Sequence, residues 1–585
     1  MIRGLALVLV AALAVQERGQ EPPKPPANPK LPPIPPPSGD GWTQFGHDAK
    51  RTSLSQDNLD LPLIPAWTYR LDQGEQLTCV VAAAGYLHLS CTTNGGRGGA
   101  RNPAILSLNA LTGEYRGLFS PDHDQSRGTW LSVFDDYNVV YHDDALGTFD
   151  CRTYIDRRWI NVGRSGSTAV DPTTKTVVTI NEYAGDGEPP LTEATAFDGR
   201  SRWKNNVWPV KRDKGRTVTH DVNVSGSTAV TAVRYTGAGV PPPKDGVYAF
   251  DVVKGTKLWL VEGKFRNLCS DAKHTYALDD DGVLHALDLK DGKEAWTATL
   301  GPVAGSPGLY KDKIIALLDT NSLVALNAED GKIAWRARTQ GAGVAKNART
   351  ALVLSAQGRA LICTTTGLAI HDLEKGAKVG EWKEDEGQQR ARLQEPLFNP
   401  IVAHGMVFVC ARDRVIALWT GTRLKEQAAN LQKHADMLRR AGKTGDAVRF
   451  LRAIDAADGL KEGARKMAQD ELAELEKQGE KEFAEAGRMR GKGLLALAQR
   501  MFALIAREYV GFDLAKKALE DSDALTLKLG DSLVASEALF KEAQWLEDQK
   551  KPKEALQLYQ EVAGRYPDTA SGRKAADRAR QLAEK

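Results

Sequence analysis

The stretch Leu284-His-Ala-Leu-Asp-Leu-Lys-Asp-Gly-Lys-Glu-Ala-Trp296 decides the fold, because residues 247–259 and 323–335 repeat its pattern. All three stretches read apolar-x-Ala-x-[Asp/Asn]-x-x-x-Gly-x-x-x-Trp. Their final tryptophans are 37 and 39 residues apart. A period near 40 residues with several short strands in each unit predicts a β-propeller.

Each fixed position of the repeat has a physical reason. Asp or Asn bonds the local backbone at a hairpin turn, and the glycine four residues later supplies a positive φ. The tryptophan on the next strand is large enough to wedge between neighbouring blades. The predicted structural residues of the blades are Trp67, Trp203, Asp251, Gly255, Trp259, Asp288, Gly292, Trp296, Asn327, Gly331, Trp335 and Trp382.

Weaker copies of the repeat surround the three clear ones. One leads to Trp203, one reaches Gly113 without a following tryptophan, and one reaches Trp382 two residues late. Trp159 ends a further segment whose turn does not align. The last β segment, 399–418, lacks a tryptophan strand, and residues 65–70 near the start can supply it. Closure by pairing the two ends removes exposed sheet edges, so we expect eight blades over residues 42–423, with seven as the alternative.

The repeat and the opening Trp42-Thr-Gln-Phe-Gly-His-Asp-Ala-Lys-Arg-Thr52 resemble the pyrroloquinoline-quinone-like repeat family. This family includes quinoprotein dehydrogenases and the propeller subunit of the outer-membrane β-barrel assembly machinery. The resemblance covers residues 42 to about 422. It implies a propeller, but a shared blade repeat does not imply a shared cofactor.

The dehydrogenases of this family hold their quinone over a disulfide between adjacent cysteines, and they use a calcium ion and an aspartate base. This sequence has no adjacent cysteines, and no residues match the calcium ligands or the base. We therefore predict no catalytic, cofactor-binding or metal-binding residues, no cofactor, and no quinone-dependent dehydrogenase activity. The six cysteines also form no Cys-x-x-Cys pair, which favours buried strand residues, although a Cys79–Cys91 disulfide is an alternative.

Other motifs receive a structural interpretation. Asp279-Asp-Asp-Gly282 lacks the spacing of a calcium loop and predicts a solvated turn. Gly442-Lys-Thr444 and Gly491-Lys492 lack the earlier glycine of a phosphate loop and predict turns between helices. Asp122-His-Asp124 and His142-Asp-Asp144 are the best metal or acid–base candidates, in blade loops.

The N-terminus has the pattern of a secretory signal. Arg3 precedes the apolar run 4–15, which is too short to span a membrane, and residues 12–14 suit cleavage. We expect a signal peptide at 1–16 and a proline-rich linker at 17–41. No later stretch is apolar enough to span a bilayer. The mature protein is therefore expected outside the cytoplasm, in the periplasm, at the cell envelope or secreted.

Residues 424–585 change to Ala, Leu, Glu, Lys and Arg at helical spacing, which predicts a helical domain. Two segments match at an offset of 57 residues and resemble tetratricopeptide repeats, with an irregular bundle as the alternative. The residues predicted to pack these repeats are Ala498, Phe502, Tyr509, Ala555, Tyr559, Tyr566 and Pro567.

Composition and organisation together favour a binding protein. A net charge of only +3 over 585 residues argues against a nucleic-acid partner. A rigid propeller with a helical repeat tail suits a scaffold that binds other proteins, in one version during cell-envelope assembly. A quinoprotein-like oxidoreductase and a propeller that binds a small ligand in its central channel are the alternatives.

Overall fold

The computed structural model describes most of residues 44–583. The residues left out of the description are 1–43, 45–46, 49, 72–74, 95–100, 120–129, 134–137, 143–145, 151–155, 161–164, 182–190, 198–199, 207–215, 237–243, 340–351, 365–366, 385–396, 428–429, 441, 458–459 and 584–585.

The described strands form eight sheets, and in each of them strands that follow one another along the chain are hydrogen-bonded. Six sheets have four consecutive strands. They are β3 (Gln76–Ala83), β4 (Tyr86–Asn94), β5 (Arg101–Asn109) and β6 (Tyr115–Phe119); β7 (Trp130–Val133), β8 (Asn138–His142), β9 (Leu146–Asp150) and β10 (Asp156–Ile160); β11 (Ser165–Asp171), β12 (Thr176–Asn181), β13 (Leu191–Ala196) and β14 (Ser201–Asn206); β15 (Arg216–Ser225), β16 (Thr228–Thr236), β17 (Gly246–Asp251) and β18 (Lys257–Glu262); β19 (Phe265–Ser270), β20 (His274–Asp279), β21 (Val283–Asp288) and β22 (Glu294–Thr299); and β23 (Gly308–Tyr310), β24 (Lys313–Leu318), β25 (Ser322–Asn327) and β26 (Ile333–Arg338).

The other two sheets recruit strands from the start of the chain. In one, β1 (Leu54–Ser55) runs parallel to β27 (Leu352–Ser355), and β28 (Arg359–Cys363), β29 (Gly367–Asp372) and β30 (Lys378–Lys383) follow. In the other, β2 (Ile64–Arg70) lies beside β33 (Arg414–Trp419), and β32 (Met406–Ala411) and β31 (Phe398–Ala403) follow. This second arrangement is the pairing of chain ends that residues 65–70 predict.

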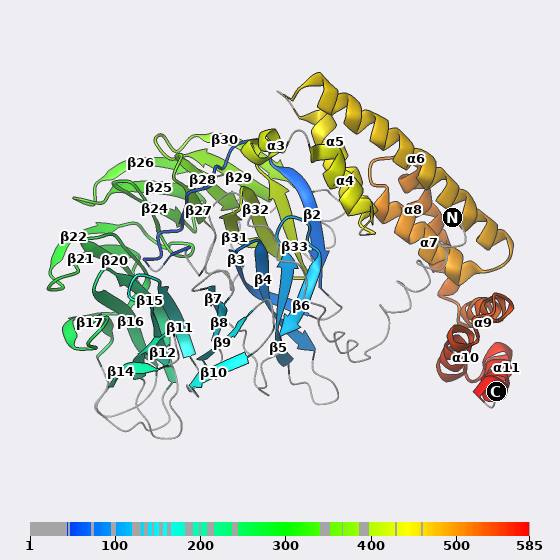
Figure 1. The fold of residues 1–585 in the computed structure, drawn as a ribbon, viewed down its shortest axis with the longest axis horizontal. Coiled ribbons are helices and arrows are strands. Elements are labelled where there is room, and N and C mark those ends of the chain that lie inside the picture. The colour runs from blue at the N-terminus through cyan, green and yellow to red at the C-terminus, as the bar shows by residue number, and fades with distance from the viewer. Residues whose placement is uncertain are drawn as a thin grey trace. The chain divides into compact units, whose positions relative to one another are not determined.

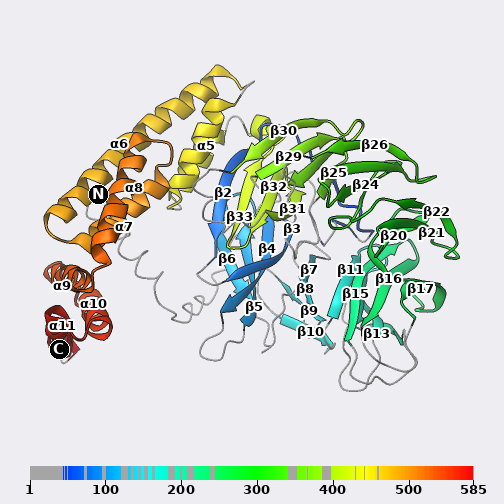
Figure 2. The same cartoon turned by 180° about the vertical axis from the view of Figure 1, so that it is seen from behind.

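The first strands of successive sheets contact one another in chain order from β3 to β31, and β31 contacts β3. The sheets therefore form a closed ring, and the prediction of a β-propeller is confirmed. Figure 1 shows the ring in colour order from blue β3 to yellow-green β33, with blue β2 beside β33, and Figure 2 shows it from behind. Because the ring is closed, every described sheet has a neighbouring sheet on both of its sides, and none exposes a whole face to solvent.

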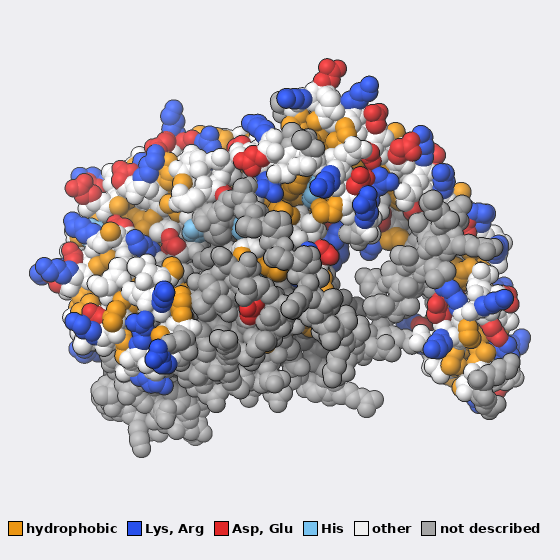
Figure 3. Space-filling model, viewed as in Figure 1, with side chains coloured by type: hydrophobic (Ala, Val, Ile, Leu, Met, Phe, Trp, Pro, Cys, Tyr) orange, Lys and Arg blue, Asp and Glu red, His pale blue; other side chains and the backbone are white. Residues whose placement is uncertain are grey.

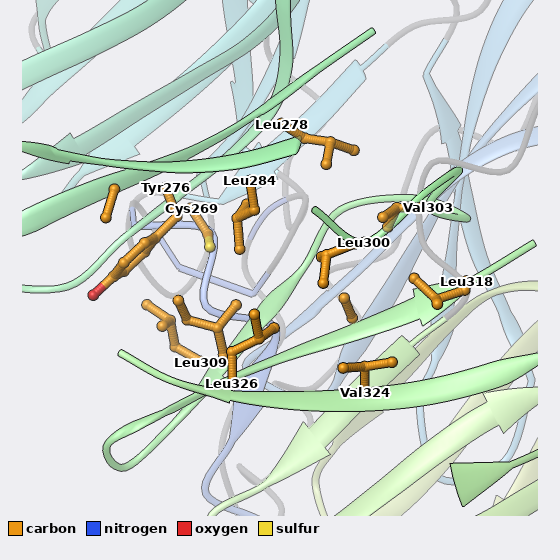
Figure 4. Close-up of a cluster of buried hydrophobic side chains, with 13 residues drawn as sticks. Cys269, Tyr276, Leu278, Leu284, Leu300, Val303, Leu309, Leu318, Val324 and Leu326 are labelled. Atoms are coloured by element: carbon orange, nitrogen blue, oxygen red, sulfur yellow. The ribbon is translucent and has the colours of Figure 1, made fainter. Parts of the chain in front are cut away.

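Apolar side chains fill the spaces between neighbouring sheets. One cluster joins the sheet β19–β22 to the sheet β23–β26 (Figure 4). Tyr276 and Leu284 of the first sheet and Ile314 and Val324 of the second are all fully buried there. Because each sheet buries both faces against its neighbours, the strands read as continuous apolar runs around alanines, such as Lys313–Leu318.

Helices make up the rest of the chain. They are α3 (Gly421–Glu426), α4 (Leu431–Arg440), α5 (Thr444–Ala456), α6 (Glu462–Gly491), α7 (Leu495–Glu508), α8 (Asp513–Leu529), α9 (Ser532–Asp548), α10 (Pro552–Arg565) and α11 (Ala570–Ala583). The prediction of a helical C-terminal region is confirmed. Among the described residues, the first helix begins at Gly421, three residues before the predicted boundary. The chain divides into a compact unit of residues 1–64 and 68–426 and a second of residues 65–67 and 427–585.

Candidate functional site

The repeat tryptophans lie against glycines of the next sheet. A Cβ atom added to Gly292 would stand 2.8 Å from the Trp259 ring, and one added to Gly376 would stand 2.6 Å from the Trp335 ring. The same contact joins Trp203 to Gly255 and Trp296 to Gly331. The four indole Nε1 atoms donate to the carbonyls of Val252, Leu289, Ala328 and Leu373, each three residues before its glycine, at 2.9–3.1 Å.

The turns that present these glycines share one geometry. In the turn after β21, the Gly292 amide donates to the Asp288 carbonyl at 2.8 Å, and the Asp288 carboxylate accepts from the Lys290 amide at 2.8 Å. Gly292 has φ +74°, which a side chain would strain. Asp251 accepts in the same way from the Val253 amide, and Asn327 accepts the Gly331 amide through its backbone carbonyl. This turn, repeated from sheet to sheet, therefore fixes the glycine surface on which each indole rests.

Trp382 does not occupy the tryptophan position of its sheet. That position, opposite Ile370, belongs to Gly380, and Trp382 lies opposite Leu368, two residues further along β30. The space that a side chain at Gly380 would need is taken by Leu61. In the sheet β3–β6 the equivalent position, opposite Ser107, is Gly117. Trp67 lies on β2 and is 1% exposed.

The described residues of the segment 44–61 (44, 47–48 and 50–61), called the strap from here on, bond to the first strands of six sheets. These strands face one another around the ring, so the strap lies at the centre of the propeller. The contacts run from Gln44 with Val170 (β11) through Arg51 with Val222 (β15), Lys50 with Ser270 (β19), Thr52 with Leu309 (β23) and Ser53 with Leu354 (β27) to Ser55 with Val402 (β31). Figure 1 shows the strap as the dark blue trace among the green strands.

A buried ion pair anchors the strap. Arg51 and Asp221 are each 1% exposed, and the Arg51 Nε atom lies 3.4 Å from Asp221 Oδ1. Arg51 also donates to the carbonyls of Val222 and Thr168, and Asp221 accepts from the Leu268 amide at 3.1 Å. An ion pair is tolerated in the interior when its remaining donors and acceptors find partners, as here. Neither residue is predicted from the sequence, because a single Arg in the opening motif carries no sign of burial.

The acidic and glycine–lysine motifs lie in turns and between helices. The Asp279 carboxylate accepts from the Val283 amide at 2.7 Å, and the Asp280 carboxylate pairs with Arg234, so both bond protein groups around the turn. Residues 442–444 connect α4 to α5, and residues 491–492 connect α6 to α7. In the described part of the chain, no three His, Cys, Asp or Glu side chains are placed to share a metal ion. The candidates at 122–124 and at 143–144 lie outside the described residues, as does the side chain of His142.

The described cysteines are buried free thiols. Cys91 lies opposite Leu77, and Cys79 opposite Ser90, so the alternative of a Cys79–Cys91 disulfide is wrong for this structure. Burial raises the pKa of the Cys269 and Cys410 thiols, which keeps them protonated and unreactive. Cys151 lies outside the described residues.

The helical region repeats itself at the offset that the sequence shows. Helix α7 shifted by 57 residues coincides with α10, and the ring pair Phe483–Phe502 recurs as Phe540–Tyr559, with centroids 5.1 and 5.5 Å apart. Ala498 and Ala555 are both fully buried. Tyr509 is buried against Gly479, whereas Tyr566 is half-buried and Pro567 exposed after α10.

Surface charge shows mixed signs. On the face in Figure 3, Lys and Arg side chains alternate with Asp and Glu side chains over the described atoms. Among the helices that the structure describes, none is both long and apolar enough to cross a membrane.

Fold and site together define a β-propeller in which four tryptophans rest on glycines of the neighbouring sheet. Residues 243–443 match the family model of the outer membrane protein assembly factor BamB. This match confirms the resemblance to the pyrroloquinoline-quinone-like repeat family that the three clear repeats predict. No curated protein matches the sequence.

Several solved structures resemble the chain at low identity. The computationally designed Ika8 protein is 14% identical, with a TM-score of 0.46, over 62% of this chain and 100% of its own. Quinohemoprotein alcohol dehydrogenase from Comamonas testosteroni is 13% identical, with a TM-score of 0.46, over 70% of this chain and 84% of its own. A europium-containing methanol dehydrogenase is 10% identical, with a TM-score of 0.45, over 64% of this chain and 89% of its own. None of these similarities carries a function to this chain.

Proposed function

We propose that the protein is a non-catalytic scaffold that binds other proteins outside the cytoplasm. The observation that carries this proposal is that the repeat tryptophans are already used in contacts between sheets. Trp203, Trp259, Trp296 and Trp335 are committed to contacts between sheets, and their indole N–H groups are already bonded. The centre of the ring holds the strap. What remains for function is the outer surface, which suits protein contacts.

We infer that each of the eight sheets is one blade, with β2 completing the blade that contains β31–β33. The unbroken circle of contacts between first strands, from β3 to β31 and back to β3, supports this count. The roles of the repeat residues as blade locks rest on the same contacts.

The helical region is proposed to be a separate domain with tetratricopeptide-like repeats that binds an extended segment of a partner. The 57-residue repeat of helices and ring pairs supports this reading. Circular dichroism of a fragment ending near residue 424 and of the remainder tests the boundary. We expect a β spectrum and a helical spectrum, and two disordered fragments would contradict it.

The match to an outer membrane assembly factor supports a role in the cell envelope. We propose export through residues 1–16, followed by the linker 17–41. N-terminal sequencing of the protein from its native host should begin between about residues 15 and 18. A mature chain that still begins at Met1 would contradict export.

The decisive test of binding uses the helical region and the full chain as baits in envelope extract. A scaffold should retain a specific protein partner on both baits, and the propeller fragment serves as the control. Failure of the full chain to retain any protein, together with turnover of an added alcohol, would overturn the proposal.

A further inference from the structure

The strap has the features of a bound peptide rather than of a fold element. Apart from the two-residue β1, the described part of the strap has no regular secondary structure. Its backbone carbonyls accept hydrogen bonds instead from the amides of Ser270, Leu309 and Leu354, which belong to three different sheets, at 2.8–2.9 Å. The Gln44 side chain bonds both the amide and the carbonyl of Val170, at 2.9 and 2.8 Å. Backbone pairing of this kind is how proteins hold extended peptides.

The strap backbone is held in a strained form. His47, Arg51 and Ser53 have φ of +75°, +63° and +55°, which side chains other than glycine disfavour. A free chain would leave these conformations, so contacts with the ring must impose them. The strap therefore becomes ordered because it is bound.

The ring supplies a specific recognition group for the strap. Asp221 is buried on β15 and presents its carboxylate to the Arg51 guanidinium. At the other end of the strap, Asp57 accepts from the Gly405 amide at 2.8 Å and Asp60 accepts from the Thr422 amide at 2.9 Å. Charge and backbone hydrogen bonds thus fix the register of the bound segment along its length.

We propose that the centre of the ring is a binding groove for an extended, arginine-bearing peptide, and that the chain occupies this groove with its own strap. Asp221 recognises the arginine, and the amides of the first strands recognise the backbone. The strap releases from the sheets as one unit, since each of its contacts holds the same strained backbone. This inference does not depend on the proposed scaffold function.

The test uses the full chain with Arg51→Ala, and Arg202→Ala as the control. Arg202 is exposed and donates to the Thr174 carbonyl at 2.9 Å, without contact to the strap. In hydrogen exchange, Arg51→Ala should speed exchange of the Ser270, Leu309 and Leu354 amides together, although they lie in three sheets. The control should leave all three amides protected.

The groove itself is tested with a labelled synthetic peptide of residues 42–62. It should bind the Arg51→Ala protein saturably, because Asp221 has lost its partner, and should not bind the wild-type protein, whose groove is filled. A peptide with Arg51→Ala should bind at least about tenfold more weakly, since it leaves a buried charge unpaired.

Two results would overturn the proposal. In one, exchange rises only around Val222 while the three distant amides stay protected, so the strap does not release as a unit. In the other, the three amides lose protection together but no peptide binds. If Arg51→Ala does not fold, Gln44→Ala serves in its place, because it removes the strap's bonds to Val170 without leaving a buried charge.

Discussion

The indole of Trp259 rests on Gly292, a residue of the next sheet, and its Nε1 atom donates to the Leu289 carbonyl at 3.0 Å. Gly292 is the fixed glycine of the copy 284–296, and Trp259 is the fixed tryptophan of the preceding copy, 247–259. The two fixed positions of one repeat therefore serve two different contacts, since each glycine receives the tryptophan of the preceding sheet. Each copy thus contacts one neighbouring sheet through its glycine and the other through its tryptophan. The repeat must therefore keep both residues at a constant spacing.

Replacing Gly292 by Ala should destabilise the propeller by about 3 kcal/mol. A Cβ would overlap the Trp259 ring, and φ +74° disfavours any side chain. Gly226→Ala is the matched control, because Gly226 has φ +59° but no atom within 4 Å of the added carbon. Denaturant unfolding of the two variants separates packing from backbone strain. Equal losses would show that the indole contact contributes nothing.

The tryptophans themselves differ in their expected cost. Trp67→Ala and Trp296→Ala should each lose on the order of 3–5 kcal/mol, the usual range for removing a well-packed Trp side chain, because Trp67 is fully buried and the partly buried Trp296 ring rests on Gly331. Trp382→Ala should lose on the order of 1 kcal/mol, because that residue, partly buried like Trp296, stands two positions beyond the place where the other tryptophans meet a glycine. Thermal melts of the three variants check this order. A Trp67→Ala protein that melts like the wild type would mean that β2 does not complete a blade.

These contacts show how far the sequence alone reaches. The spacing of Asp288, Gly292 and Trp296 is enough to predict the turn and the propeller. The turn follows from the residue types within one stretch, and the propeller follows from the recurrence of that stretch with a period near 40 residues. It cannot show that Leu61 fills the space at Gly380, since the two residues are 319 positions apart in the chain and share no pattern. The strap cannot be predicted from the sequence for a similar reason: three of its hydrogen bonds to the ring use the backbone carbonyls of Lys50, Thr52 and Ser53, and every residue has such a carbonyl.

A buried histidine should make stability depend on pH. Burial lowers the pKa of His88 to about 3, and its Nδ1 atom lies 2.9 Å from the Ser107 hydroxyl. The pKa of a histidine in the unfolded chain is about 6.5. Between pH 6.5 and 3 the unfolded state therefore binds one more proton than the folded state, and the free energy of unfolding falls as the pH falls. The loss is about 1.4 kcal/mol for each pH unit below 6.5.

His88→Asn removes this titration while keeping a side chain that can bond Ser107. The free energy of unfolding of the wild type should drop by about 2 kcal/mol more than that of the variant between pH 7 and pH 5. Acid-sensitive carboxylates act equally in both proteins and cancel in the comparison. Parallel pH profiles would mean that His88 becomes protonated in the folded protein.

The last prediction is that the propeller binds no pyrroloquinoline quinone and oxidises no alcohol or sugar. A redox quinone needs a metal or cation to polarise its carbonyl, a base to take the substrate proton, and flat faces to hold its ring. The indoles of Trp259, Trp296 and Trp335 lie on glycines of neighbouring sheets and are not free to stack on a cofactor. The repeat acids Asp251 and Asp288 bond the backbone of their own turns.

The strap also lies where a cofactor at the centre of the ring would have to bind. Purified protein incubated with quinone and calcium should therefore show no binding in calorimetry and no dye reduction with a panel of alcohols and aldoses. The Gln44→Ala protein belongs in the same experiment, because loosening the strap tests whether the strap alone keeps a cofactor out. Calcium-dependent binding at micromolar quinone with turnover would establish an oxidoreductase, whereas binding by Gln44→Ala without turnover would show a site that lacks the base.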